Sequence, residues 1–172
     1  MATNVQFIKK EKLTSTANNL SITNCFSANY DVYKIIISKV DLSGLANFRM
    51  RLIKSDDSID STTNYDHATQ ILRSYSSVSE QKHTGQSYWR YISSQSASSY
   101  AGNGIEITMY NPFDSSSYTF HKTNSAGFLE ASGIYAPHGI GVHKVAQSNT
   151  GFQMLLSIGN YEVLEVAVYG VK

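Results

Sequence analysis

Residues 30–40 read Tyr30-Asp-Val-Tyr-Lys-Ile-Ile-Ile-Ser-Lys-Val40, and this stretch decides the fold class. β-Branched and aromatic residues of this kind favour a strand. Because Ile35, Ile36 and Ile37 are consecutive, they place apolar side chains on both faces of that strand, and an edge strand would expose one row of them. We therefore expect residues 30–40 to lie in the interior of a sheet. Residues 161–171 have the same character, and we expect them to form a second central strand.

Outward from this stretch, apolar and polar residues alternate with period two, which is the pattern of a strand that buries one face. The alternation is clearest in residues 48–52, 105–109, 118–121 and 152–156. In the first of these segments we expect Phe48, Met50 and Leu52 to point into the core. Arg49 and Arg51 are expected to point away from it.

In the third segment the same pattern has Tyr118 and Phe120 alternating with Thr119 and His121. An antiparallel strand commonly buries its apolar side and leaves its polar side in water. We therefore expect the two aromatic rings to face the core.

Ten segments in all have strand character, and turn sequences such as Asn103-Gly104 and Asn111-Pro112 separate them. About nine or ten strands in one domain predict an all-β fold. We predict an antiparallel β-sandwich of jelly-roll type, with a closed barrel as the alternative.

The first 19 residues differ from the rest of the chain, since they are polar apart from one short apolar patch. We expect residues 1–19 to form an arm or an edge strand, and residues 20–172 to form the single domain. An apolar patch on a polar segment is better explained by a partner surface than by solvent. Val5, Phe7 and Ile8 are therefore predicted to contact another protein of an assembly or a further copy of this chain.

The composition excludes several classes of protein. The chain has 172 residues, of which 14 are basic and 13 acidic, and its formal charge is +1. A protein that binds nucleic acid normally has a clear basic excess, so we expect no nucleic-acid partner. No apolar run is long enough for a membrane span and the N-terminal residues lack the pattern of a signal peptide, so no membrane insertion is expected. The single cysteine excludes an internal disulfide framework.

The histidines do not combine into a metal or cofactor site. His138 and His143 are five residues apart, so on one strand they would point to opposite faces and could not share an ion. His67, His83 and His121 each stand alone among ordinary neighbours. We expect neither a metal nor a cofactor.

The acidic and nucleophilic residues likewise form no catalytic motif. Asp56, Asp57 and Asp60 lie in one segment that we interpret as a solvated loop. Weak structural calcium is the alternative, although the ligand spacing and the glycine of a calcium-binding loop are lacking. No Gly-x-Ser-x-Gly sequence is present. We predict that the protein is not an enzyme.

Aromatic residues beside a serine-rich segment are the one feature that favours binding. Tyr88, Trp89 and Tyr91 precede this segment, and Tyr100 lies within it. Tyrosine, serine, glycine and asparagine together are typical of recognition loops. We predict that Tyr88, Trp89, Tyr91 and Tyr100 contact a ligand, with the alternative that these rings plug the end of the core.

The order of several short motifs is also informative. Phe26-x-x-x-Tyr30-Asp-x-Tyr33 opens the first central strand, Asn111-Pro-Phe113 follows another strand, and Val168-Tyr-Gly170 lies in the last one. With this order over residues 20–172, the chain resembles a family of small virion proteins of marine tailed phages, cyanophages in particular. The shared motifs are structural and not catalytic.

The resemblance implies a non-enzymatic virion structural protein, exposed on the particle as a capsid decoration, a head appendage or a tail-fibre component. Its partners would be other virion proteins and further copies of the chain, and a glycan on the host surface is a further expected contact. Such a protein would be made in the host cytoplasm without a signal peptide and would end in the virion. The competing interpretation is a free carbohydrate-binding module of lectin type.

Overall fold

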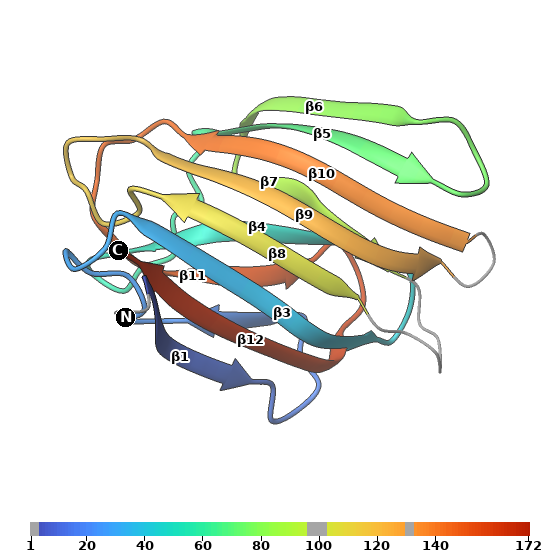
Figure 1. The fold of residues 1–172 in the computed structure, drawn as a ribbon, viewed down its shortest axis with the longest axis horizontal. Helices are drawn as coiled ribbons and strands as arrows, with labels where there is room; N and C mark the ends of the chain where they lie inside the picture. The colour runs from blue at the N-terminus through green and yellow to red at the C-terminus, as the bar shows by residue number, and fades with distance from the viewer. Residues whose placement is uncertain (1–3, 96–102, 130–132) are drawn as a thin grey trace.

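The computed structural model describes residues 4–95, 103–129 and 133–172. These residues form two antiparallel sheets packed face to face, and they contain no helix (Figure 1). The predicted antiparallel β-sandwich is therefore confirmed. Within the same ranges there is no helix that could cross a membrane.

The larger sheet has eight strands and the smaller sheet has four. In spatial order the larger sheet consists of β1 (Val5–Lys12), β12 (Tyr161–Val171), β3 (Val32–Leu42), β8 (Gly104–Tyr110), β9 (Thr119–Leu129), β10 (Gly133–His143), β5 (Tyr65–Arg73) and β6 (Ser79–Gln86). The smaller sheet lies behind it in Figure 1 and consists of β2 (Asn19–Ile22), β11 (Asn149–Leu156), β4 (Ala46–Lys54) and β7 (Trp89–Gln95). We call the side of the larger sheet that is turned away from the smaller sheet the outer face.

The described residues hold twelve strands, which is more than the sequence predicted. β1 lies within residues 1–19, for which an arm or an edge strand was expected, and β6 has no counterpart among the predicted segments. β6 has the sequence Ser-Glu-Gln-Lys-His-Thr-Gly-Gln, so it contains no apolar residue from which burial with period two could be predicted. Pairing with β5 holds it in the sheet, and this pairing is a tertiary feature.

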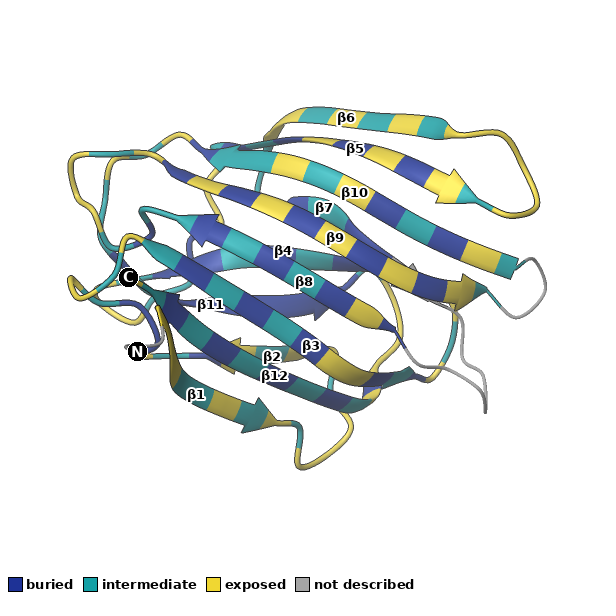
Figure 2. Cartoon of the chain, viewed as in Figure 1, coloured by how far each residue is buried: buried dark blue, intermediate teal, exposed yellow. Residues whose placement is uncertain are grey.

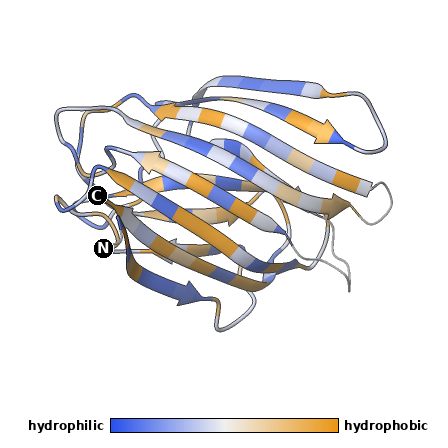
Figure 3. Ribbon diagram, in the orientation of Figure 1, coloured by the Kyte–Doolittle hydropathy of each residue, from blue (hydrophilic) through white to orange (hydrophobic). Residues whose placement is uncertain are grey.

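An apolar core lies where β12, β3 and β8 face β2, β11 and β4, and we call this region the apolar half. β3 and β12 are neighbours inside the larger sheet, as predicted, and β3 has strongly apolar bands in Figure 3. Phe48, Met50 and Leu52 of β4 are fully buried. Arg49 and Arg51 are partly exposed on the opposite side of the strand, which confirms the predicted orientation of β4.

The inner side of β9, β10 and β5 is different, and together with β7 we call it the polar half. β7 packs against all three strands. The inward side chains of β9 are buried and polar, and they are Thr119, His121, Thr123 and Ser125. Figure 2 shows the resulting alternation of buried and exposed residues along β9.

The predicted orientation of the start of β9 is therefore wrong. Tyr118 and Phe120 are 46% and 44% exposed, whereas Thr119 and His121 are buried. Alternation reveals the period of a strand but not which of its two sides faces the core. Here the inner side is fixed by contact with β7, whose Trp89 ring lies 4.4 Å from the His121 ring.

β1 and β6 are the two edges of the larger sheet. In β1 a bulge between Phe7 and Lys9 shifts the register against β12. Lys9 pairs with Glu11 at 2.8 Å, and Lys10 pairs with Glu165 at 2.8 Å. Bulges and lysines on an edge strand obstruct pairing with another chain, so the β1 edge is protected against strand-to-strand association.

Candidate functional site

Three histidines that are far apart in the sequence come together in the polar half. His67 on β5 and His83 on β6 are cross-strand partners, and their rings stack with 5.1 Å between centroids. His121 on β9 borders the same hollow of the surface as these two residues. The expectation that His67, His83 and His121 stand alone is therefore wrong, because strand pairing brings distant parts of the sequence together.

Burial keeps these imidazoles neutral at neutral pH. Burial, and to a smaller degree the nearby His83 and Arg90, lowers the pKa of His67 to about 4. Burial also lowers the pKa of His121 to about 3, with a smaller effect from His67. Neutral imidazoles can bind metal ions. In the part of the chain that the structure describes, however, no three His, Cys, Asp or Glu side chains are grouped so as to hold one.

Two glycines of β10 allow the polar side chains to pack against the backbone. A Cβ atom at position 141 would lie 2.3 Å from Cε1 of His121 and 2.7 Å from Cδ1 of Trp89. A Cβ atom at position 139 would lie 2.8 Å from Oγ1 of Thr69. Glycine within a strand often marks such a close approach. Gly139 and Gly141 therefore fit this packing because they lack a side chain.

A second buried polar pair lies at one end of the polar half. Asp56 and Asp57 are exposed, as predicted for a solvated loop, but Asp60 is only 2% exposed, which corrects that prediction. Nε2 of His143 lies 3.1 Å from Oδ2 of Asp60, and the Thr62 backbone N–H donates to Oδ1 at 3.0 Å. Burial alone would raise the pKa of Asp60, but His143 and Thr62 outweigh it and hold this pKa below its usual range. The buried carboxylate therefore stays charged and anchors the loop.

Of the four aromatic residues predicted to contact a ligand, the structure describes three, and these three lie in different environments. Trp89 is fully buried, and its Nε1–H donates to a backbone carbonyl of β10 at 3.2 Å, so it is a core residue. Tyr88 lies on the other side of the strand, with its ring centroid 4.5 Å from the guanidinium carbon of Arg49. Tyr91 is partly buried in the polar half. Tyr100 lies outside the described residues.

The apolar residues near the N-terminus are also divided between two environments. Val5 and Phe7 are exposed on β1, whereas Ile8 packs against the core. The Phe7 ring lies 5.7 Å from the ring of Tyr169 on β12, between centroids. Of the three residues, only the first two are therefore open to a partner.

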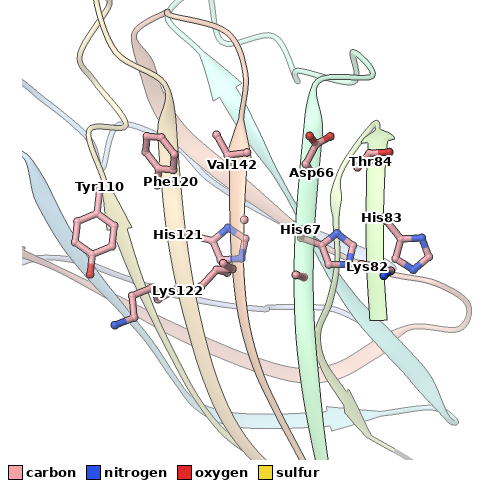
Figure 4. Close-up of a pocket in the computed structure, with 13 residues that line it drawn as sticks. Asp66, His67, Lys82, His83, Thr84, Tyr110, Phe120, His121, Lys122 and Val142 are labelled. Carbon is pink, nitrogen blue, oxygen red and sulfur yellow. The ribbon is translucent and has the colours of Figure 1, made fainter. Parts of the chain in front are cut away.

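The outer face of the polar half is hollowed. The hollow has a volume of about 770 Å³, which lies within the range of roughly 300–1,000 Å³ that is usual for ligand sites. Phe120, Ile140 and Val142 line it, with Tyr110 on one side and Asp66 on the other (Figure 4). Its apolar lining therefore comes from the same side of β9 that the sequence pattern assigned to the core.

Strand register arranges the outer side chains into rows that cross the sheet. The first row is Tyr110, Phe120, Val142 and Asp66. The second row is Thr108, Lys122, Ile140, Ala68 and Lys82. The third row is Glu106, Asn124, His138, Gln70 and Glu80. Neighbours within a row have Cβ atoms about 5 Å apart, so a ligand can contact several strands at once.

A second hollow, of about 460 Å³, lies over the second and third rows. It shares Ala68, Lys122 and Ile140 with the first hollow, and we call the two together the trough. His138 lines the second hollow, while His143 is buried, so these two residues do point to opposite faces of β10 as predicted.

The charges in the trough are unequal. The Asp66 carboxylate is engaged by the Lys144 ammonium group at 2.8 Å and by the Gly85 backbone N–H at 2.8 Å. Lys82 and Lys122 form no ion pair with any residue in the described ranges. The trough therefore presents free positive charge and little free negative charge.

Sequence reasoning missed the trough because its residues come from five strands whose register is not visible in the sequence. One signal was present, namely two glycines within a single strand segment at Gly139 and Gly141, where close packing of a neighbour is expected. It indicated an unusual strand but not the hollow beside it.

The amino-acid sequence was compared with protein families and curated proteins. No protein-family model matches the chain, and no curated protein is significantly similar to it. The function is therefore inferred from the arrangement of side chains on the outer face and from the order of the sequence motifs.

Proposed function

We propose that the protein is a non-enzymatic structural protein of a phage particle, exposed as a capsid decoration, a head appendage or a tail-fibre component. We further propose that the outer face of its polar half contacts the host surface. The order of the motifs around Tyr30, Asn111 and Tyr169 supports the assignment to a particle. The trough supports the contact role.

The observation that carries the contact role is the reversed burial of β9 and β10. Large apolar side chains of these two strands face solvent, and they are Phe120, Phe128, Ile134 and Ile140. Exposed apolar patches of this kind mark interaction sites more often than plain surface. Positions where a local rule of folding is broken are expected to be functional ones.

The chemistry of the trough favours binding over catalysis. Its two carboxylates are both engaged, Asp66 by Lys144 and a backbone N–H and Glu106 by Lys34, so neither is free to abstract a proton. The imidazoles of His67 and His121 belong to the buried side of the sheet. What remains for a ligand is ring surface, amide and hydroxyl groups, two ammonium groups and the imidazoles of His83 and His138.

A particle surface also compensates for weak single contacts. Stacking on one aromatic ring is worth only about 0.5–1.5 kcal/mol beyond the burial of area. Many copies of one domain on a particle raise the overall strength of attachment without any new contact. A rigid sandwich with an open binding face suits this arrangement.

The second candidate is a free carbohydrate-binding module of lectin type. The trough supports this function equally, because a soluble lectin needs the same ring surfaces and polar groups. Presence in the particle distinguishes the two. We expect mass spectrometry of gradient-purified particles to find this chain at a fixed copy number, and its absence would favour the free module.

The contact role is tested on particles that carry Phe120→Ser. We expect them to assemble normally and to adsorb to host cells more slowly than wild-type particles. Ile158→Ser is the matched control, because Ile158 is 68% exposed but lines neither hollow. Equal adsorption of wild-type and Phe120→Ser particles would contradict the contact role.

A further inference from the structure

We propose that the trough binds an acidic oligosaccharide, a chain of sugar rings that carry carboxylate or sulfate groups. This inference rests on the proposed contact role of the outer face and names the ligand class for it. Its support is the combination of an apolar hollow, a polar hollow and two free lysines on one continuous surface.

The first hollow provides a platform for the apolar side of a sugar ring. Tyr110 and Phe120 are cross-strand partners, and Phe120 is also opposite Val142. These three side chains therefore form a continuous apolar strip on the outer face (Figure 4). Pyranose rings have a C–H face that packs on such a strip through the burial of apolar area. Because the strip is on three paired strands, it is rigid before the ligand arrives.

The second hollow provides partners for hydroxyl groups. Thr108, Asn124 and His138 line it, and each offers a side-chain donor or acceptor. Sugar hydroxyls need such groups, because a hydroxyl that loses water without a new hydrogen bond costs free energy. Shared residues join this hollow to the first one, so a ligand of several rings can occupy both. A single sugar would leave one of the hollows unused.

The lysines specify an acidic ligand. Lys82 and Lys122 lie in the same row, on β6 and β9, with β5 and β10 between them. Three strand spacings of about 4.8 Å separate their Cα atoms by roughly 14 Å. Both ammonium groups are free of ion pairs with described residues, so each can pair with a negative group of the ligand.

The two carboxylates that line the trough are both paired with lysines. Asp66 is paired with Lys144 at 2.8 Å, and Glu106 is paired with Lys34 at 2.7 Å. These are the carboxylates that line the two hollows. Glu80, the cross-strand partner of Gln70 on β6, is exposed but lines neither hollow. Among the residues that line the hollows, Lys82 and Lys122 are therefore the charged groups without an ion pair to a described residue.

The test is titration of the purified full-length chain with tetragalacturonate, followed by NMR of backbone amides. We expect resonances of β9, β10 and β5 to shift, and we expect the fully methyl-esterified, uncharged tetramer to bind about tenfold more weakly. Raising the salt concentration should weaken binding of the acid form only, because exposed charge pairs are screened.

Variants identify the residues responsible. Lys122→Gln and Lys82→Gln should each weaken binding of the acid form about two- to fivefold. Neither should alter binding of the ester. Lys39→Gln is the matched control, because Lys39 is an exposed lysine that lines neither hollow, and it should bind like the wild type. Phe120→Ala should weaken binding of both forms about two- to tenfold.

Several results of the titration would overturn the proposal. They are equal binding of acid and ester, shifts confined to other surfaces, and absence of shifts at the solubility limit of the probe. Self-association that buries the outer face and that Ile140→Thr abolishes would also overturn it, because a second copy of the chain would then be the occupant of the trough.

If no acidic sugar binds while Phe120→Ser particles still adsorb poorly, the proposed ligand class is wrong and the contact role stands. If the sugar binds but the chain is absent from particles, the site stands and the particle role fails.

Discussion

The apolar half and the polar half are built from the same two sheets, but they bury different chemistry. In the apolar half, inward residues such as Ile35, Ile107 and Val166 are fully buried hydrocarbons. In the polar half, the equivalent positions hold residues such as Thr123 and His121. The second arrangement needs specific partners, because a buried polar group without a hydrogen bond costs free energy.

The difference shows how stability and binding are distributed over the larger sheet. Hydrocarbon burial in the apolar half depends little on partner geometry or pH. The polar half depends on neutral imidazoles, on two glycines and on the ring of Trp89. In return, β9 and β10 turn their apolar side chains outward, where the trough uses them.

The largest effect is expected from a charge placed in the apolar half. Met50→Asp should destabilise the fold by at least about 4 kcal/mol, because it buries a carboxylate without a partner. Arg49→Gln, one residue away on the other side of β4, should cost no more than about 1 kcal/mol, the value of its contact with the Tyr88 ring. Urea unfolding monitored by Trp89 fluorescence gives both values. Equal losses would mean that the two faces of β4 are equally buried.

Acid should destabilise the polar half specifically. His67 and His121 have folded-state pKa values of about 4 and about 3, below the ordinary value of 6.5. Between pH 6.5 and the lowered pKa of each histidine, the unfolded chain therefore binds more protons than the folded protein. The stability that comes from the neutral imidazoles is complete above pH 6.5 and is lost as the pH falls toward 4 for His67 and toward 3 for His121. The loss should reach the order of a few kcal/mol. Asp60, whose pKa is also lowered, adds to the loss below its ordinary pKa.

A variant at His67 tests the origin of the acid effect. The charged or titratable groups that influence the His67 imidazole are His83 on β6, Arg90 on β7 and Asp66 on β5, and the Tyr91 ring on β7 lies 6.5 Å from it between centroids. Unfolding measured from pH 8 to pH 4 should show a smaller slope in His67→Gln than in the wild type. An unchanged slope would show that titration elsewhere causes the acid sensitivity.

A smaller effect is expected from a methyl group added to β10. Gly141→Ala should cost about 1–3 kcal/mol, because the new Cβ would overlap the packed rings of His121 and Trp89. Gly104→Ala on β8 is the matched control, since a Cβ there meets nothing within 4 Å. Thermal unfolding of the two variants compares them directly. A wild-type melting temperature for Gly141→Ala would mean that the polar half is loosely packed.

The smallest effect on stability is expected on the outer face. Ile140 is 60% exposed, so Ile140→Thr should change the free energy of unfolding by no more than about 0.5 kcal/mol. Ile107→Thr, at a fully buried position of the apolar half, should cost roughly 2 kcal/mol or more. Chemical denaturation of the pair tests whether the outer isoleucine contributes to folding. A large loss for Ile140→Thr would mean that the outer face is covered, as in an oligomer.

The apolar half could be predicted from the sequence in detail. Consecutive isoleucines placed β3 inside the sheet, and the alternation around Met50 gave the correct orientation of β4. Both predictions rest on apolar side chains that are in fact buried, which is the case that hydrophobic patterning describes. The sandwich follows from the number of such strands.

The polar half and the trough could not be predicted in the same way. For β9 the pattern gave the correct period and the wrong side, because Phe120 is exposed and His121 is buried. The juxtaposition of His67 with His83, and of Phe120 with Val142, depends on strand register, which a single sequence does not reveal. Among the aromatic residues predicted to contact a ligand, Trp89 is fully buried, because the side of β7 that faces the core is likewise not visible in the sequence.

The place of β12 between β1 and β3 has a consequence for how the chain folds. β12 is the last of the described strands to leave the ribosome, yet its two partners are among the first. Until it is inserted, the isoleucine-rich β3 has an open backbone edge, which is an aggregation hazard in nascent chains. Pairing of strands so distant in sequence is also slow, since the loop-closure entropy must be lost before the contacts form. The yield of soluble protein should therefore depend on how long the edge of β3 stays unpaired before β12 is added. Slower synthesis at low temperature, or chaperones that cover apolar strands, should raise this yield.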